Sequence, residues 1–134
     1  MATILQIANS DKHLTLFTKG LKTAELESKL AEIGPFTILG PVNLALGRLS
    51  ALTYDQLLEP ANREKLINLL SGYIIVGKKM FHDFRKDQKI SMLNGDQVTV
   101  SISNGSTTVN GAQILAHDRQ GSNGVVHLLA STFQ

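Results

Sequence analysis

Four Asn-Gly pairs lie close together in the second half of the chain, at 94–95, 104–105, 110–111 and 123–124. Asn-Gly is the strongest short hairpin signal, because both residues tolerate the positive φ angles of a type I′ turn. Apolar residues alternate with polar ones over 97–103, as in a half-buried strand. The pair at 104–105 follows this strand directly, so the sequence predicts a hairpin there. We expect residues 73–134 to be mostly strand.

The first half of the chain has the apolar spacing of helices instead. Thr53 and Gln56 match a capping box, and Pro60 suits the first turn of the next helix. One short strand, residues 36–39, is bounded on both sides by Gly-Pro pairs. The predicted inner faces of the helices comprise Leu14, Phe17 and Leu21; Leu26, Leu30 and Ile33; and Leu66, Ile67 and Leu70. The sequence therefore predicts one α+β domain over residues 1–134.

The composition excludes several classes of function. Thirteen Lys and Arg against eleven Asp and Glu give a net charge of +2, too small for a whole-surface grip on nucleic acid. The chain has no cysteine, which excludes disulfides, a thiol nucleophile and a Cys zinc site. Its apolar runs are far shorter than the ~20 residues of a membrane-spanning helix. No export signal is visible, so we expect a cytoplasmic chain or a mature exported form.

Residues 72–78 have the spacing of a phosphate-binding P-loop, but Lys79 stands where a Ser or Thr should ligate magnesium. The residues between the two glycines are bulky, so a buried strand ending in a turn is the better interpretation. His117 and Asp118 are adjacent, and on a strand they should face opposite sides. We therefore expect no metal site, and we expect no cofactor.

His127 lies in an apolar strand, after two valines and before two leucines. We expect a buried imidazole that donates to a backbone carbonyl, because buried polar groups are normally hydrogen-bonded. The alternative is an enzyme that uses His127 together with Asp118. That alternative requires His127 to be exposed in a cleft, with the Asp118 carboxylate within hydrogen-bonding reach.

Residues 78–89 form a basic segment with a net charge of +3. We interpret it as a solvated loop, and a weak contact with a polyanion or with anionic lipid headgroups is the alternative. Its cations are Lys78, Lys79, Arg85, Lys86 and Lys89.

Three segments, in this order, resemble the fasciclin domain family. They are residues 34–43 (GPFTILGPVN), residues 57–66 (LLEPANREKL), and residues 109–112 (VNGA) with 122–129 (SNGVVHLL). The resemblance extends from about residue 3 to residue 133. It implies an α+β fold, described as a fasciclin-like β-sandwich wedge flanked by several helices. The structural motif residues that it matches are Pro35, Phe36, Pro41, Asn43, Gly111, Asn123, Gly124 and His127.

The resemblance also implies a function, namely a non-enzymatic adhesion or matrix-interaction module outside the cell. We expect a protein or a glycan as its partner, no nucleic acid, and a monomer or weak homo-oligomer. The family commonly has Tyr-His where this chain has Tyr73-Ile74, and Asp-Ile where it has Asp118-Arg119. Because these positions are linked to receptor binding in animal members, we group them with the basic segment as the candidate interaction surface, without expecting integrin binding.

A small-molecule or lipid carrier is the alternative function. It would need a pocket of roughly several hundred Å³ among the leucine-rich N-terminal helices.

The side chain of Asn43 is expected to cap the turn that follows it. Aromatic residues make up only 5% of the chain. Because aromatic anchors dominate strong interfaces, we expect any contacts to be weak and multivalent.

Overall fold

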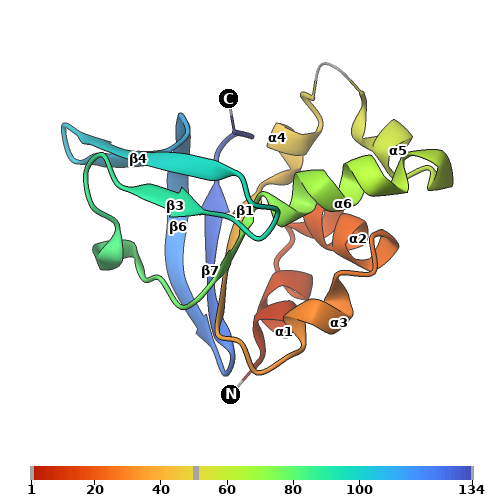
Figure 1. Ribbon diagram of the computed structural model, residues 1–134, viewed down its shortest axis with the longest axis horizontal. Coiled ribbons are helices and arrows are strands. Elements are labelled where there is room, and N and C mark those ends of the chain that lie inside the picture. Colours follow the sequence, from red (N-terminus) through yellow and green to blue (C-terminus); the bar gives the residue numbers. More distant parts are fainter. Residues whose placement is uncertain (1, 50–51, 134) are drawn as a thin grey trace.

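The computed structural model describes residues 2–49 and 52–133, with the helices on one side and the sheet on the other (Figure 1). The helices are α1 (Ile4–Asn9), α2 (Thr15–Thr23), α3 (Glu27–Leu30), α4 (Asn43–Leu46), α5 (Tyr54–Leu57) and α6 (Arg63–Ser71), with 3-10 turns η1 (Pro60–Asn62) and η2 (Phe81–Asp83). The strands are β1 (Phe36–Pro41), β2 (Ile74–Val76), β3 (Lys89–Ser91), β4 (Gln97–Ser103), β5 (Ser106–Val109), β6 (Ala112–Gly121) and β7 (Gly124–Leu129).

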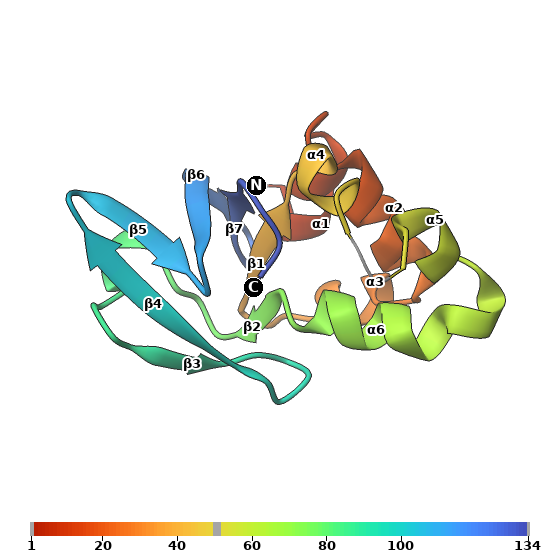
Figure 2. The same ribbon diagram turned by 90° about the horizontal axis from the view of Figure 1, so that it is seen from above.

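The seven strands form one sheet in the order β2-β1-β7-β6-β5-β4-β3. Strand β1 runs parallel to β7 and antiparallel to β2. The sheet curls until its two ends approach each other, where the Leu93 amide donates to the Ile74 carbonyl at 2.8 Å (Figure 2). The α+β class is confirmed. The strand pairing describes one curled sheet, close to a barrel, and does not confirm the two-layer sandwich wedge.

Most local signals form the structures they predict. The capping box of Thr53 and Gln56 is present at the start of α5. The hairpin at 104–105 joins β4 to β5, with φ angles of 52° at Asn104 and 79° at Gly105. At the last Asn-Gly pair the register differs by one residue. Gly121 pairs with Gly124, so the two-residue turn consists of Ser122 and Asn123.

The second predicted inner face, Leu26, Leu30 and Ile33, is wrong at its last residue. Helix α3 stops at Leu30, which is buried, and the side chain of Ile33 is 91% exposed. A helix of four residues presents only one turn to the core, so the apolar spacing no longer applies at Ile33.

The core spans both halves of the chain. Phe17 of α2 meets Tyr73 edge-to-face, with ring centroids 6.4 Å apart. All six residues of β7 are buried, because α1 packs near this strand while the segment between β2 and β3 reaches it at Lys79 and Phe84. Within the part of the chain that the structure describes, no helix has the length and apolarity to cross a bilayer.

Candidate functional site

His127 is fully buried, and both of its ring nitrogens have partners. Nε2 lies 2.7 Å from the carbonyl oxygen of Lys79, and Nδ1 lies 3.1 Å from the backbone nitrogen of Asp118. A carbonyl can only accept and an amide N–H can only donate, so these partners place the ring proton on Nε2. The expectation of a buried imidazole that donates to a backbone carbonyl is confirmed.

The geometry that the catalytic alternative requires is not present. The Asp118 carboxylate accepts from the backbone N–H of Phe81 at 2.8 Å and lies 3.0 Å from Nδ1 of His117. It makes no hydrogen bond to the His127 ring, whose nitrogens are occupied by backbone groups. His127 therefore holds three segments together and offers no nitrogen to a substrate.

The expectation that His117 and Asp118 face opposite sides of a strand is wrong. The pairing of β6 with β7 shifts register between Ala116 and Arg119, and Asp118 has a φ of 63°. A bulge of this kind interrupts side-chain alternation, so the two side chains meet, and the His117 ring stacks on Phe81 at 4.0 Å. Among the described residues, no group of three or more His, Asp or Glu could hold a metal.

Burial lowers the pKa of His127 below its ordinary value of 6.5, although the Lys79 carbonyl and the Asp118 charge act in the opposite direction. Because the unfolded chain takes up this proton more readily, the free energy of unfolding should fall as the pH drops below about 6.5. We expect urea titrations from pH 7 to pH 5 to show a shallower loss of stability for His127→Gln than for the wild type.

The matched control is His82→Gln, because the His82 side chain is 76% exposed and its contact with Asp83, at the surface, contributes little to stability. Its slope should equal that of the wild type. Burial raises the pKa of Asp118, but the Phe81 amide and His117 together lower it by more than burial raises it, so the net shift is downward. Asp118 therefore titrates below the range from pH 5 to pH 7 that the experiment covers. Identical slopes in the wild type and His127→Gln would show that the buried imidazole takes up its proton without cost.

Two residues of the candidate interaction surface are buried, which corrects the prediction. Tyr73 is 2% exposed and Ile74 is 0% exposed. The Tyr73 ring stacks on Phe133 with centroids 4.3 Å apart, and its hydroxyl accepts from the Phe133 amide at 2.9 Å. Ile74 belongs to β2, which packs into the core beside β1. Neither side chain can contact a partner without unpacking the core.

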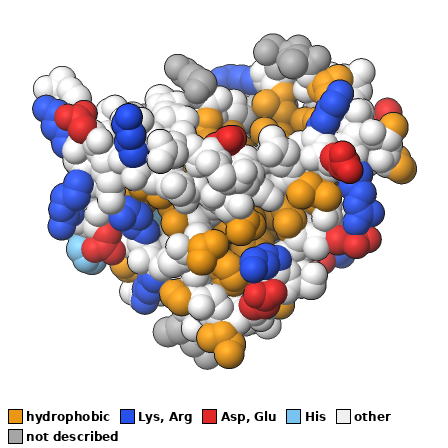
Figure 3. All heavy atoms as spheres, viewed as in Figure 1, with side chains coloured by type: hydrophobic (Ala, Val, Ile, Leu, Met, Phe, Trp, Pro, Cys, Tyr) orange, Lys and Arg blue, Asp and Glu red, His pale blue; other side chains and the backbone are white. Residues whose placement is uncertain are grey.

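The charged residues of the candidate surface do lie at the surface. Lys78, Arg85, Lys86 and Lys89 are exposed, and the Lys79 Nζ lies 5.8 Å from the centre of the Phe84 ring. Figure 3 shows Lys and Arg side chains on the left of this face, on the side where β3 lies in Figure 1.

Arg119 is committed to an ion pair with Asp11, which links β6 to the loop between α1 and α2. Burial raises the pKa of Asp11, but the His13 amide and Arg119 together lower it below its usual value. Arg119 is therefore engaged by Asp11, whereas Asp118 is hydrogen-bonded to the basic segment through the Phe81 amide.

An apolar groove is the surface feature that the sequence reasoning missed. Leu44 of α4 is 72% exposed and Leu115 of β6 is 56% exposed, and both line one hollow of about 330 Å³. We call it the Leu44–Leu115 groove; its other lining residues are His13, Val42, Asn43, Ala116, Arg119 and Leu128. One signal was present in the sequence. Ile114 and Leu115 are neighbours on a strand, so one of them had to face outward.

Asn43 positions the edge of this groove, but not by capping its own helix. No side chain caps α4. The Asn43 Oδ1 accepts from the Leu16 amide at 2.9 Å, and its Nδ2 donates to the Thr15 hydroxyl at 2.9 Å. Helix α2 has no side-chain cap of its own, so an asparagine 27 residues away supplies one.

A second hollow, of about 370 Å³, has the size and lining that the carrier alternative requires. All four of its leucines come from the helical half of the chain, and the hollow is open to solvent. Its lining residues are Arg48, Leu49, Leu52, Leu57, Lys65, Leu69, Thr132 and Phe133.

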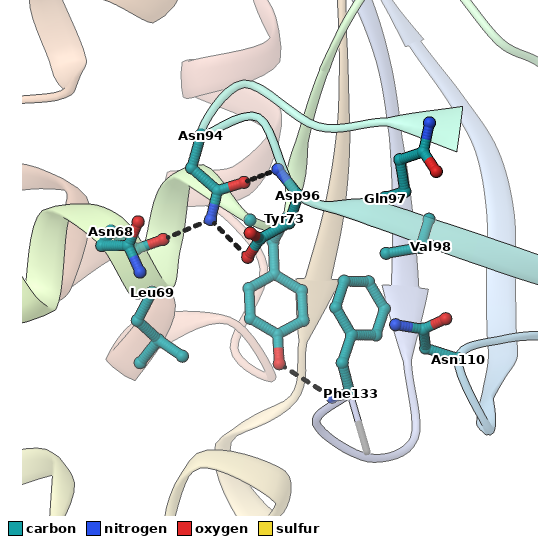
Figure 4. A pocket seen from close by; sticks show the side chains of 10 residues that line it. Asn68, Leu69, Tyr73, Asn94, Asp96, Gln97, Val98, Asn110 and Phe133 are labelled. Carbon is teal, nitrogen blue, oxygen red and sulfur yellow. Dashed lines mark hydrogen bonds between the residues drawn. The ribbon is translucent and has the colours of Figure 1, made fainter. Parts of the chain in front are cut away.

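A third hollow, of about 350 Å³, is lined by amide side chains (Figure 4). We call it the amide pocket; its lining residues are Asn68, Leu69, Gly72, Tyr73, Asn94, Asp96, Gln97, Val98, Asn110 and Phe133. In Figure 4 the end of α6 lies on the left and the β3–β4 turn lies above. The rings of Tyr73 and Phe133 lie in the middle, with Asn110 to their right.

Comparison with known proteins gives consistent matches. Residues 12–133 match the model of the fasciclin domain. Protein sll1483 of Synechocystis sp. is 31% identical over 127 residues, which cover 95% of this chain and 70% of that protein. The transforming growth factor-beta-induced protein ig-h3 of Sus scrofa is 26% identical over 129 residues, covering 96% of this chain but 19% of that protein.

The fold has a solved counterpart. The FAS1 domain pair from the insect cell adhesion molecule fasciclin I superposes with a TM-score of 0.75 at 15% sequence identity. The match covers 99% of this chain and 51% of the pair, so this chain corresponds to about half of that structure. At this identity the comparison shows the fold alone.

Proposed function

This chain belongs to the fasciclin domain family, and we propose that it is a non-enzymatic adhesion module, secreted or held at a bacterial cell surface, that binds a protein or a glycan. Adhesion is named in the description of fasciclin I, whose domain pair shares the fold. The bacterial setting is supported by the similarity to a Synechocystis protein. The buried, fully bonded His127 favours a binding role over catalysis by this residue.

The Leu44–Leu115 groove is the single observation that supports this function best. Its two exposed leucines line the same hollow as the buried residues Val42 and Leu128. Leucine side chains offer no hydrogen bonds, so they match apolar protein side chains and not the hydroxyls of a glycan. We therefore assign the groove to a protein partner. Exposed apolar groups that gather in one place are typical of protein–protein contact sites.

Beads coated with the protein should attach to cells or matrix of its source, and Leu44→Asp with Leu115→Asp should reduce this attachment. Each leucine buried at an interface contributes about 1.5 kcal/mol, so each substitution should weaken binding about tenfold. Ile33→Asp is the matched control, because Ile33 is 91% exposed and does not line the groove. Unchanged attachment of the double variant would remove the groove from the proposal, and a loss of self-association in sedimentation would identify a second copy as the partner.

A small-molecule or lipid carrier is the second candidate. The leucine-lined hollow at the helices supports it, and Arg48 and Lys65 at its edge would suit an anionic headgroup. The hollow is open to solvent, however, and carrier sites bury most of their ligand's surface. Adhesion therefore remains the leading proposal.

A further inference from the structure

We propose that the amide pocket binds a neutral saccharide. The inference goes beyond the adhesive groove and does not depend on it, because the two hollows share no lining residue. The volume of the amide pocket, about 350 Å³, lies at the lower end of the range of about 300–1,000 Å³ found for small-molecule sites. A single sugar ring, or the terminal sugar of a glycan, is of suitable size.

The pocket carries polar groups, most of them on exposed residues, that make no hydrogen bond within the described part of the protein. Among the described residues, no partner hydrogen-bonds the side-chain amides of Asn68 and Gln97, the Nδ2 of Asn110, or the Oδ1 of Asp96. Each side-chain amide can both donate and accept, and a carboxylate can only accept. Sugar hydroxyls do both, so these groups together can hydrogen-bond several adjacent hydroxyls of one ring.

The charge of the pocket favours a neutral ligand over an anion. Of its ten described lining residues, none is Lys, Arg or His, and Asp96 contributes one carboxylate. A phosphate or an acidic sugar would meet this carboxylate without a compensating cation. An uncharged sugar avoids that repulsion and uses the carboxylate as an acceptor.

An aromatic ring supplies the apolar surface that the C–H face of a sugar requires. Phe133 is held by its stacking on Tyr73 and by the hydrogen bond from its amide to the Tyr73 hydroxyl. In Figure 4 the Phe133 ring lies between Tyr73 and Asn110.

Hydrogen bonds within the protein hold one part of the pocket wall, namely Asn94, Asp96 and Asn110. The Asn94 Nδ2 donates to the Asn68 carbonyl at 2.9 Å and to the Asp96 Oδ2 at 3.0 Å, while its Oδ1 accepts from the Asp96 amide (Figure 4). The β3–β4 turn is thereby attached to the end of α6. Asn110 is held in place because its Oδ1 accepts from the Thr99 amide at 2.8 Å. Preorganisation of this kind reduces the entropic cost of binding.

The test is an NMR titration of the ¹⁵N-labelled protein with glucose, galactose, mannose and N-acetylglucosamine, each followed separately. We expect at least one of these sugars to shift the side-chain NH₂ resonances of Gln97 and Asn110 in a saturable manner. Glucuronate should shift these resonances less than glucose does, because its carboxylate is repelled by the carboxylate of Asp96. Gln97→Ala combined with Asn68→Ala should weaken binding about tenfold or more, since sites built on hydrogen bonds depend strongly on them.

Gln113→Ala is the matched control, because Gln113 is an exposed strand glutamine that does not line the pocket. It should leave the affinity unchanged. The inference is overturned if none of the four sugars shifts these resonances, if the double variant binds as well as the control, or if glucuronate binds most tightly. It is also overturned if a tetra-alanine peptide shifts the same resonances and the sugars do not. The groove variants Leu44→Asp and Leu115→Asp should bind the sugar normally, which separates this outcome from that of the adhesion proposal.

Discussion

We expect the Gly124→Ala variant to lose its folded structure under conditions in which the wild-type chain is folded. A Cβ at this position would overlap the carbonyl oxygen of Phe36 and lie 2.9 Å from its carbonyl carbon. Both atoms are backbone atoms of β1, which pairs with β7 at this point in the register Phe36↔Gly124. They cannot move aside as a side chain could. Gly124 also has a φ of 154°, which other residues rarely adopt. The expected cost exceeds about 4 kcal/mol.

Gly95→Ala is the control that separates the two effects. Gly95 has a positive φ of 92°, and no atom lies within 4 Å of where its Cβ would be. Its replacement should therefore cost only backbone strain, about 1–2 kcal/mol. Urea unfolding followed by circular dichroism measures both variants. If Gly124→Ala were no less stable than Gly95→Ala, the close approach of β1 and β7 would be wrong.

The parts of this fold that the sequence predicts correctly are those set by neighbouring residues. Thr53 and Gln56 are three residues apart, and Asn104 and Gly105 are adjacent, so the capping box and the hairpin follow from local chemistry. The bulge at Asp118 does not follow in this way. It depends on the register shift between β6 and β7. It also depends on the hydrogen bond that the Asp118 carboxylate accepts from the Phe81 amide, and these two residues are 37 positions apart in the chain.

The candidate sites were harder to predict for the same reason. The Leu44–Leu115 groove joins residues from α4 and β6, and the amide pocket joins the end of α6 to three other segments. Nothing in the spacing of these residues along the chain brings them together. Tyr73 shows the opposite error. Because Tyr73 stands at a family position linked to receptor binding, the resemblance predicts that it lies on the interaction surface. The Tyr73 ring instead stacks on Phe133 and is buried.

The residues that match the family determine the fold of this chain. Asn43 accepts from an amide at the start of α2, and Asn123 accepts from the Ile4 amide at the start of α1. Each asparagine satisfies one of the N–H groups that a helix leaves unpaired at its first turn, and each does so from a distant part of the chain. The asparagines and glycines of the family segments do not include the residues proposed for binding. Those residues are the leucines of the Leu44–Leu115 groove and the amides Asn68 and Gln97. Membership of the family therefore predicts the architecture, and binding must be tested at residues outside these motif positions.

Asn123→Ala should destabilise the protein by about 3 kcal/mol. Asn123 is 8% exposed and makes three hydrogen bonds. Its Oδ1 accepts from the Ile4 amide at 3.0 Å, and its Nδ2 donates to the carbonyls of Leu30 and Glu32 at 2.8 and 3.0 Å. One side chain thus connects the β6–β7 turn to α1 and to the segment that leads into β1. Alanine would leave a buried donor and two acceptors without partners, and unsatisfied buried groups cost more than a hydrogen bond contributes.

Two further variants show whether these hydrogen bonds carry the effect. Asn62→Ala removes one exposed hydrogen bond, from Nδ2 to the Gln56 carbonyl at 2.8 Å, and should cost less than about 1 kcal/mol. Asn123→Asp keeps an acceptor for the Ile4 amide but places a carboxylate against the two carbonyl oxygens, so it should be at least as destabilising as Asn123→Ala. Chemical denaturation at pH 7 ranks the three variants. If Asn123→Asp were as stable as the wild type, the two donated bonds would contribute nothing, and the link between the helical half and the sheet would have to lie elsewhere.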